Sequence, residues 1–441
     1  MMTHMQPSLD DRLKRLRDTR TLLSTGRVAQ VIGLTIEGQG PSAALGELCQ
    51  VHLDPRNTRP AVVVGFREDR VLLMPLGELE GICPGMEISA SGRPLSIHLT
   101  PRLRGRVVDG LGQPLDELGR LGTGEMRSLA ANPPDPLRRP RVKDVIPLGV
   151  RAVDGLMTCG RGQRIGIFGG SGVGKSTLLG MFARYAKADL NVIALIGERG
   201  REVRDFIERD LGPEGLARSV VVVVTSDQPA LMRVKGALTA ATIAEYFRDQ
   251  GLDVLMMMDS VTRFCTAQRE IGLAVGEPPT TRGYTPSVFA LLPKLLERSG
   301  NSERGSITGL YTVLVEGDDM NEPVADAVRS ILDGHIVLSR TLAGANHYPA
   351  IDVLHSQSRT FGDITTPEHR AAAANVRDLM AVHEQVRDLV QVGAYVKGSN
   401  PKADLALSIW PKIQGLLRQD ANDLTSFDQV VARLRELPKA P

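Results

Sequence analysis

Cysteine is scarce in this chain, which has only Cys49, Cys83, Cys159 and Cys265 among its 441 residues. The four lie far apart and form no C-x-x-C pair, so the sequence contains neither a zinc-site pattern nor a disulfide framework. We therefore interpret them as buried free thiols of a protein that works in a reducing compartment.

Aromatic residues are also few, and neither positive nor negative charge is in excess. The chain has one Trp and six Tyr, too few for a surface that stacks on single-stranded bases. Its 53 Lys and Arg nearly balance its 51 Asp and Glu, so no global field favours nucleic acid as a partner. No apolar run approaches the roughly 18 residues that span a bilayer, and the charged N-terminus lacks the apolar core of a secretion signal. We expect a cytoplasmic protein that binds no nucleic acid.

What the chain does have is a phosphate-binding loop. The pattern G-x-x-x-x-G-K-[ST] covers Gly169 to Ser176, between the apolar stretch 165–168 and a helical pattern from Lys175 to Lys187. A strand before the loop and a helix after it make a chance glycine-rich turn the weaker interpretation. The backbone N–H groups would hold a di- or triphosphate, Lys175 would reach the outer phosphates and the Ser176 hydroxyl would hold Mg²⁺. We assign nucleotide binding to Gly169, Gly170, Ser171, Gly172, Val173, Gly174, Lys175, Ser176 and Thr177.

Changes in the hydrophobic pattern divide the chain into five segments. Residues 1–24 predict a short amphipathic helix, and the short alternating runs in 25–100 predict a small β-barrel. The proline-rich segment 101–145 is expected to be a connector with no helix of its own. In 146–366 strands and helices alternate, which predicts an α/β core with a parallel sheet, and only helical patterns remain in 367–441. The expected core strands are 165–168, 191–197, 220–225, 253–259, 306–315 and 335–339.

The N-terminal helix has two interpretations. Its leucines recur at helical spacing with Arg and Lys between them, which suits a partner groove or an anionic membrane surface. A leucine stripe is equally ordinary on a helix that packs on its own domain. The sequence does not choose between the two.

Two carboxylates follow core strands and are candidates for the chemistry. Asp259 ends the apolar strand that begins at Val254, where a phosphate-loop enzyme needs a second group near Mg²⁺, although such an Asp can also cap a helix. Glu198 follows the strand that begins at Val192, where a carboxylate could orient or deprotonate water in line with the leaving phosphate oxygen. The alternative for Glu198 is a surface ion-pair cluster with Arg199, Arg201 and Glu202.

Longer motifs carry a resemblance to a family. The phosphate loop, Gly197-Glu-Arg-Gly-Arg-Glu-Val and Asp259-Ser-Val-Thr-Arg-Phe resemble the rotary-type ATPases, the group with the ATP synthase catalytic subunit. Gln268-Arg-Glu-Ile-Gly-Leu-Ala-Val-Gly-Glu-Pro-Pro, Arg282-Gly-Tyr-Thr-Pro-Ser-Val-Phe and Leu295-Leu-Glu-Arg-Ser-Gly resemble the export ATPases of type III secretion. Thr225-Ser-Asp-Gln-Pro-Ala-Leu-Met-Arg and Ala244-Glu-Tyr-Phe-Arg-Asp-Gln-Gly are closer to the flagellar branch than to the virulence branch.

The resemblance implies a RecA-like P-loop NTPase core with an N-terminal β-barrel that serves oligomerisation and a C-terminal helical domain. It implies that ATP and Mg²⁺ are the cofactors, that Lys175 and Glu198 are catalytic, and that Asp259 acts with Ser176 at the metal. Arg199 matches a residue beside the catalytic carboxylate, and the resemblance places it and Arg359 among the catalytic residues. From the family alone, Tyr348 resembles the aromatic that packs on adenine, and Arg359 resembles an arginine finger supplied to a neighbouring subunit.

The partners also come from the resemblance. It implies a homohexamer that energises flagellar protein export by releasing or unfolding chaperone-bound substrates. Further partners are a stator-like regulatory protein at the N-terminal helix, a central stalk protein, export chaperones with their substrates, and the export gate. The protein would then be cytoplasmic but peripherally associated with the inner membrane at the base of the export apparatus.

Three other interpretations are weaker. A virulence-type secretion ATPase stays possible, whereas a synthase catalytic subunit typically carries an acidic loop that residues 386–417 lack. An RNA-translocating hexamer would need a basic, aromatic N-terminal fold, which 25–100 does not provide. A non-catalytic scaffold would be expected to have lost Lys175 or Glu198, and both are present.

Overall fold

The computed structural model describes residues 23–315, 317 and 319–439. These form two compact units, the first ending at Leu95 and the second running from Ser96 to the C-terminus. The helix expected in residues 1–24 falls almost entirely outside the described residues. In the part of the chain that is described, no helix combines the length and apolarity needed to cross a membrane.

The first unit is a closed β-barrel, as predicted. Its strands follow the order β1-β2-β5-β4-β3-β6 around the barrel. Alternation sends every second side chain inward, so in β3 the side chains of Cys49 and Val51 are buried in the barrel core while Gln50 is only half-buried. The strands are β1 (Thr25–Ile32), β2 (Thr35–Gln39), β3 (Glu47–His52), β4 (Thr58–Arg67), β5 (Arg70–Pro75) and β6 (Glu87–Pro94).

The second unit is built on a nine-stranded sheet in the order β17-β16-β10-β15-β13-β11-β12-β8, with β14 added beside β15. Most neighbours are parallel, and consecutive valines in β12 suit a strand that is buried on both faces. The strands are β8 (Val107–Val108), β10 (Arg164–Gly169), β11 (Leu190–Glu198), β12 (Ser219–Thr225), β13 (Asp253–Asp259), β14 (Gly300–Asn301), β15 (Ser306–Leu314), β16 (Gly334–Leu338) and β17 (Ile351–Ser358). All six predicted core strands are present within two residues of their expected bounds.

The predicted α/β core is confirmed, and two features of this unit add to the prediction. The sheet is mixed, because β14 and β17 run antiparallel to their neighbours. The predicted connector 101–145 is also more than a linker: β8 extends the central sheet through Val107 and Val108, β9 (Glu125–Ser128) pairs with β7 (Ser96–Leu99), and a 3-10 turn, η1, covers Pro101–Leu103. Strands this short are completed by partners far along the chain, so they leave no local pattern.

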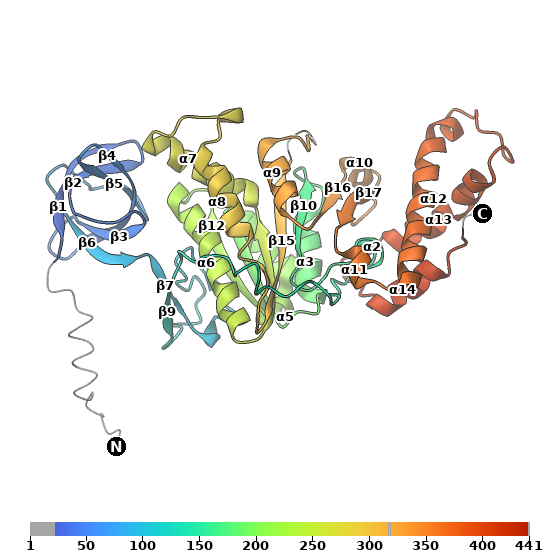
Figure 1. Cartoon of the computed structure of the whole chain (residues 1–441), viewed down its shortest axis with the longest axis horizontal. Coiled ribbons are helices and arrows are strands. Elements are labelled where there is room, and N and C mark those ends of the chain that lie inside the picture. Colours follow the sequence, from blue (N-terminus) through green and yellow to red (C-terminus); the bar gives the residue numbers. More distant parts are fainter. Residues whose placement is uncertain (1–22, 316, 318, 440–441) are drawn as a thin grey trace, which may run out of the picture. The chain divides into compact units, whose positions relative to one another are not determined.

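Helices cover both faces of the central sheet (Figure 1). Ile165 and Ile167 of β10 pack on the side of α3, while α6 and α7 pack on β11, β13 and β15 from the opposite side. The helices of this core are α2 (Arg151–Leu156), α3 (Lys175–Tyr185), α4 (Gly200–Asp205), the π-helical η2 (Phe206–Leu211), α5 (Gly212–Ala217), α6 (Ala230–Asp249), α7 (Val261–Val275), the 3-10 turn η3 (Thr281–Gly283), α8 (Pro286–Leu296), α9 (Pro323–Ile331), α10 (Arg340–Gly344) and α11 (Phe361–Ile364).

The chain ends in three helices, α12 (Pro367–Gln391), α13 (Pro401–Leu417) and α14 (Phe427–Arg435), which confirms the predicted helical domain (Figure 1). Each begins at a side chain that accepts a backbone N–H: Thr366, Asn400 and Ser426. Asn400 accepts the backbone N–H groups of Lys402 and Ala403, as expected of a strong N-cap residue.

A buried polar junction fastens this helical domain to the core. The Arg151 side chain donates to the carbonyl oxygens of Leu416 and Arg418 and to the Asp423 carboxylate. Gln419 accepts the Arg151 backbone N–H at 2.8 Å and donates to the Gly149 carbonyl at 2.9 Å. The end of α13 is therefore tied to the start of α2 mainly through the buried side chains of Arg151 and Gln419.

Candidate nucleotide site

The phosphate loop lies where β10 ends and α3 begins. Gly172 and Gly174 have φ values of 81° and 88°, a region that side-chain-bearing residues rarely adopt, so these glycines are required by the loop conformation. The loop is held from the neighbouring strand, since the Val315 N–H donates to the Gly169 carbonyl at 3.2 Å. The free N–H groups at the start of α3 thus stand in a fixed place for an anion.

Lys175 and Asp259 meet beside this loop. The Lys175 Nζ lies 2.7 Å from the Asp259 Oδ1, and both side chains are mostly buried. The Thr312 hydroxyl donates to the same carboxylate oxygen at 2.7 Å. Strand β13 carries Asp259 to the carboxyl edge of the sheet, two strands away from β10, which places it next to the loop.

The oxygen ligands at this point suit Mg²⁺. The Ser176 hydroxyl and the Asp259 carboxylate are hard oxygen donors, and Mg²⁺ takes one or two such protein ligands while phosphates and waters fill its other positions. Among the described residues no group of three or more His, Cys, Asp and Glu forms a complete metal cage. The donor set therefore fits a cation that arrives with a nucleotide.

Glu198 stands at the end of β11, the neighbour of β13, with Leu195 of β11 directly opposite Asp259. Burial and, after it, the Asp259 carboxylate raise the pKa of Glu198 to about 8 against the opposing charge of Lys175. A hydrogen bond with Glu202 also raises this pKa. The site thus holds a carboxyl group that titrates near neutral pH, which is the property expected of a proton acceptor.

Two arginines lie beside Glu198, and only one of them was a sequence candidate. Arg199 immediately precedes α4, and its side chain is 81% exposed at 3.7 Å from Glu202, so it points away from the loop in this state. Arg263, on the first turn of α7, packs so closely on Gly197 that a Cβ there would lie 2.9 Å from the Arg263 Cβ. In the sequence, the position of Arg263 one helical turn after Asp259 was the signal that could have identified it as a residue near the site.

Tyr348 lies at the other end of the phosphate loop. A Cβ at Gly174 would come within 3.3 Å of its ring, and the residue is 41% exposed. Its backbone carbonyl accepts the Gln419 N–H at 2.9 Å, which links this aromatic to the junction with the helical domain. A partly exposed ring beside the loop can receive a flat base, as a buried core aromatic could not.

Arg359 is not brought to this site. It follows β17, whose last residue, Ser358, pairs with Gly334 at the amino end of β16. The phosphate loop follows the carboxyl end of β10, which runs parallel to β16 and is about 17 Å long at roughly 3.3 Å per residue. The exposed Arg359 side chain therefore lies at the opposite edge of the sheet from the loop of its own chain.

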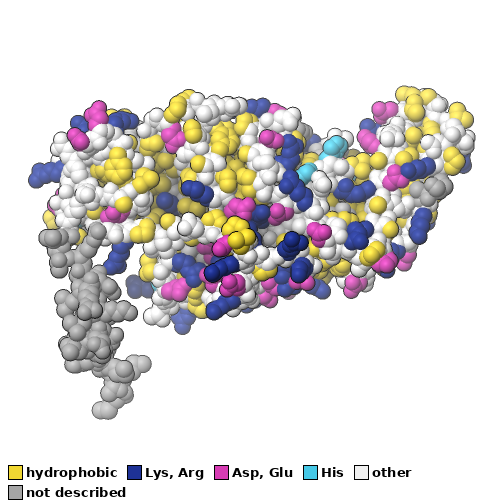
Figure 2. Space-filling model, in the orientation of Figure 1, with side chains coloured by type: hydrophobic (Ala, Val, Ile, Leu, Met, Phe, Trp, Pro, Cys, Tyr) yellow, Lys and Arg dark blue, Asp and Glu magenta, His cyan; other side chains and the backbone are white. Residues whose placement is uncertain are grey.

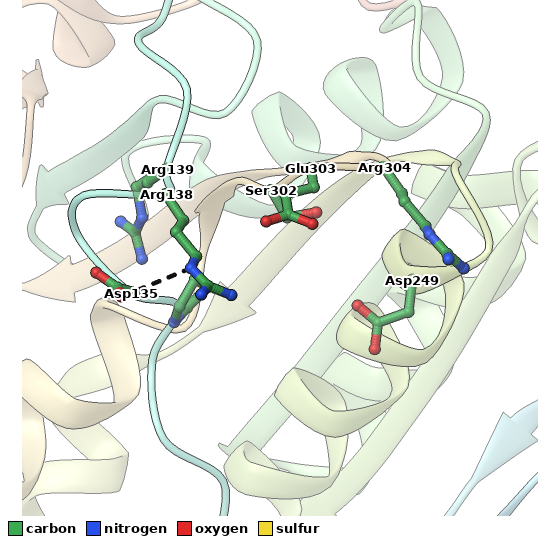
Figure 3. Close-up of a pocket in the computed structure, with 8 residues that line it drawn as sticks. Asp135, Arg138, Arg139, Asp249, Ser302, Glu303 and Arg304 are labelled. Atoms are coloured by element: carbon green, nitrogen blue, oxygen red, sulfur yellow. Dashed lines mark ion pairs between the residues drawn. The ribbon is translucent and has the colours of Figure 1, made fainter.

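The cavities at that opposite edge are not candidates for nucleotide chemistry. One of about 400 Å³ lies between the proline-rich segment, the end of α6 and the turn before β15, and Figure 3 shows its arginines facing carboxylates, with Arg138 paired to Asp135. A larger one, of about 1090 Å³, lies beside it and is lined by both arginines and carboxylates. The visible face in Figure 2 likewise mixes both charges without a field of one sign.

Three family models match successive parts of the chain. Residues 28–92 match the beta-barrel domain of the ATP synthase alpha/beta family, 149–358 its nucleotide-binding domain, and 365–436 the T3SS EscN ATPase C-terminal domain.

Two relatives are about half identical to the chain. A flagellum-specific ATP synthase of Bacillus subtilis is 53% identical and a type 3 secretion system ATPase of Xanthomonas euvesicatoria is 52% identical, each covering 93% of the chain and at least 93% of the relative. Two solved structures of the ATPase EscN from the type III secretion system of enteropathogenic E. coli, one assembled and one also with its central stalk EscO, superpose with TM-scores of 0.89 and 0.87. Both are 47% identical and cover 93% of this chain and 99% of theirs.

Proposed function

The chain belongs to the flagellar and type III secretion ATPases of the ATP synthase alpha/beta family, and we propose that it hydrolyses Mg-ATP in a homohexameric ring that energises flagellar protein export. The main observation in favour of a ring is that Arg359 lies far from the phosphate loop of its own chain. An assembled relative at 47% identity supports it. Export would proceed by releasing or unfolding chaperone-bound substrates.

Each residue of the site has a proposed part in hydrolysis. When ATP enters, Lys175 leaves Asp259 for the outer phosphates, and the N–H groups of residues 169–177 hold the phosphate chain. Ser176 and Asp259 would hold Mg²⁺, which supplies charge stabilisation for the transferred phosphoryl group. Glu198 orients the attacking water and accepts its proton, with Arg199 beside it, while Tyr348 packs on the adenine.

The transition state needs one more positive charge. Charge spreads over the three outer oxygens of the transferred phosphoryl group, and a guanidinium inserted from outside stabilises it. We assign this finger to Arg359 of the neighbouring subunit. A single subunit then holds only part of the site, and hydrolysis depends on assembly.

The remaining partners follow the same proposal. The barrel within residues 25–100 would join subunits in the ring, residues 101–145 would connect it to the ATPase core 146–366, and the helical domain 367–441 would face chaperones, substrates and the export gate. A central stalk protein is proposed because EscN binds its stalk EscO. Residues 1–24 would recruit a stator-like protein and keep the ring at the inner membrane.

Specific activity should rise with protein concentration through the range in which the ring assembles. Each added neighbour supplies an Arg359 to a site that otherwise lacks one, so turnover per subunit increases until assembly is complete. Steady-state phosphate release combined with light scattering measures both quantities on one sample. A Lys175→Ala chain should assemble over the same range without activity. A flat specific activity across the transition would contradict sites at subunit interfaces.

The flagellar branch needs its own test, because 53% and 52% identity to the two branches do not separate them. A pull-down with the full chain from lysate of its own host should retain flagellar export chaperones. Retention of virulence chaperones would move the assignment to the other branch, and retention of synthase subunits would favour the rotary synthase.

A further inference from the structure

A second cation contacts the phosphate loop from within the same subunit. Arg340 is the first residue of α10, and its guanidinium lies on the backbone of Gly170. A Cβ built on Gly170 would lie 2.7 Å from the Arg340 Nε and 2.9 Å from its Cζ, and also collide with Nη2. The built Cβ is closer to Nη2 and Nε than to Cζ, so the edge of the guanidinium that carries these two nitrogens is turned towards Gly170.

The backbone around Arg340 keeps it at this edge. Strand β16 is the parallel neighbour of β10, with Val337 opposite Phe168, so both strands end together. The Ser339 N–H donates to the Ala350 carbonyl at 2.8 Å, and the Ser339 hydroxyl accepts the Leu342 N–H. These hydrogen bonds fix the Arg340 backbone beside the loop, although Arg340 as a whole is exposed to solvent.

Gly170 is required here for space and not for conformation. Its φ lies outside the left-handed region that Gly172 and Gly174 occupy, so an L-residue could adopt its backbone angles. A side chain at Gly170 would instead have to push aside the guanidinium, which is the flexible far end of Arg340. The sequence pattern leaves this position free, since any residue may follow the first glycine of the loop.

We propose that Arg340 is a positioning residue of the nucleotide site, holding the phosphate loop in its anion-binding shape through the contact with Gly170. The inference rests on the proposed function in one respect, that this loop binds ATP. A guanidinium stays charged throughout the physiological range, and it presents Nε and Nη2 on one rigid edge, which a Lys ammonium cannot do. Arg340 therefore restrains the loop and adds fixed positive charge beside the phosphates.

A double-mutant cycle tests the contact. Arg340→Ala should raise the KM for Mg-ATP about tenfold with kcat changed less than about twofold, the size expected when one charged contact to a binding loop is lost. Gly170→Ala should do the same, because its methyl group displaces the guanidinium. The double variant should be no worse than either single one, since both changes remove one contact. The proposal would be overturned if the two increases in KM multiplied in the double variant. It would also be overturned if Arg340→Ala kept the wild-type KM.

Further variants separate the possible failures. Arg340→Lys keeps the charge without the rigid edge of two nitrogens and should resemble Arg340→Ala, so a wild-type KM in it would overturn the argument from the guanidinium edge. The unfolding midpoint of Arg340→Ala should stay that of the wild type, whereas a lowered midpoint would assign Arg340 to stability instead. Arg433→Ala on α14, an equally exposed arginine, should keep the wild-type KM. Lys175→Ala should lose binding of a fluorescent ATP analogue; if it binds normally, the nucleotide site itself is wrong.

Discussion

Glu198→Gln is expected to leave ATP binding nearly intact and to lower kcat by about 10² to 10⁴, the contribution of a well-placed general base. Glutamine keeps the size and one hydrogen-bond acceptor of the carboxyl group but cannot take a proton from water. Binding should persist because the phosphates are held by the loop and Lys175. Single-turnover hydrolysis together with binding of a fluorescent ATP analogue separates the two effects.

The raised pKa of Glu198 adds a pH test with a definite sign. A general base works only when deprotonated, so with a pKa near 8 the kcat/KM of the wild type should rise with pH and level off above that value. Below it, burial and Asp259 keep the carboxyl group protonated and the enzyme inactive. Glu198→Gln should lose this rise.

Glu202→Gln is the matched control for Glu198. Its carboxyl group is half-exposed and raises the pKa of Glu198 through a hydrogen bond and its charge. Removing that charge should keep turnover and shift the rise in kcat/KM to lower pH. If Glu198→Gln hydrolyses ATP like the wild type, or the wild type shows no rise between pH 6 and about 9, Glu198 is not the base.

The residues on the nucleotide side of the sheet were predictable because the physics that places them is local. The phosphate loop is one continuous pattern, and Asp259 and Glu198 each end an apolar run. Carboxyl ends of parallel strands share an edge of the sheet, so strand assignment alone brings them near the loop. The register that sets Leu195 against Asp259 then follows from the pairing of β11 and β13.

Contacts between distant segments were not predictable. Residues 101–145 were predicted to be a connector because Val107 and Val108 form a strand only by pairing with β12. The contacts of Arg340 with Gly170 and of Arg263 with Gly197 depend on packing that a sequence does not display, and no sequence pattern singles out Arg340. The raised pKa of Glu198 is likewise a property of burial.

No sequence pattern around Arg359 indicated a catalytic role, and its assignment came only from the resemblance to the family. In the sequence it is a surface cation, and in one folded subunit it is still one, at the edge of the sheet away from the loop. Its assignment depends on what a second copy brings. That makes it the residue for which a test in mixed assemblies is decisive.

Arg359→Ala is expected to lower kcat by about 10³ to 10⁵ in a uniform ring, the range measured for arginine fingers. ATP binding should remain, because the Lys175 side of the site is untouched. The distinguishing experiment mixes this variant with Glu198→Gln before assembly. A site between an Arg359→Ala subunit that supplies Glu198 and a Glu198→Gln subunit that supplies Arg359 has both groups.

In a random equal mixture about a quarter of the interfaces have this composition, so roughly that fraction of wild-type activity should return if sites act independently in head-to-tail contacts. Mixing Lys175→Ala with Glu198→Gln is the matched control. Both of those residues belong to the same side of the site, so no interface contains an intact pair and no activity should return. Recovery confined to the first mixture assigns Arg359 to the neighbouring subunit, whereas failure of both mixtures removes it from the site.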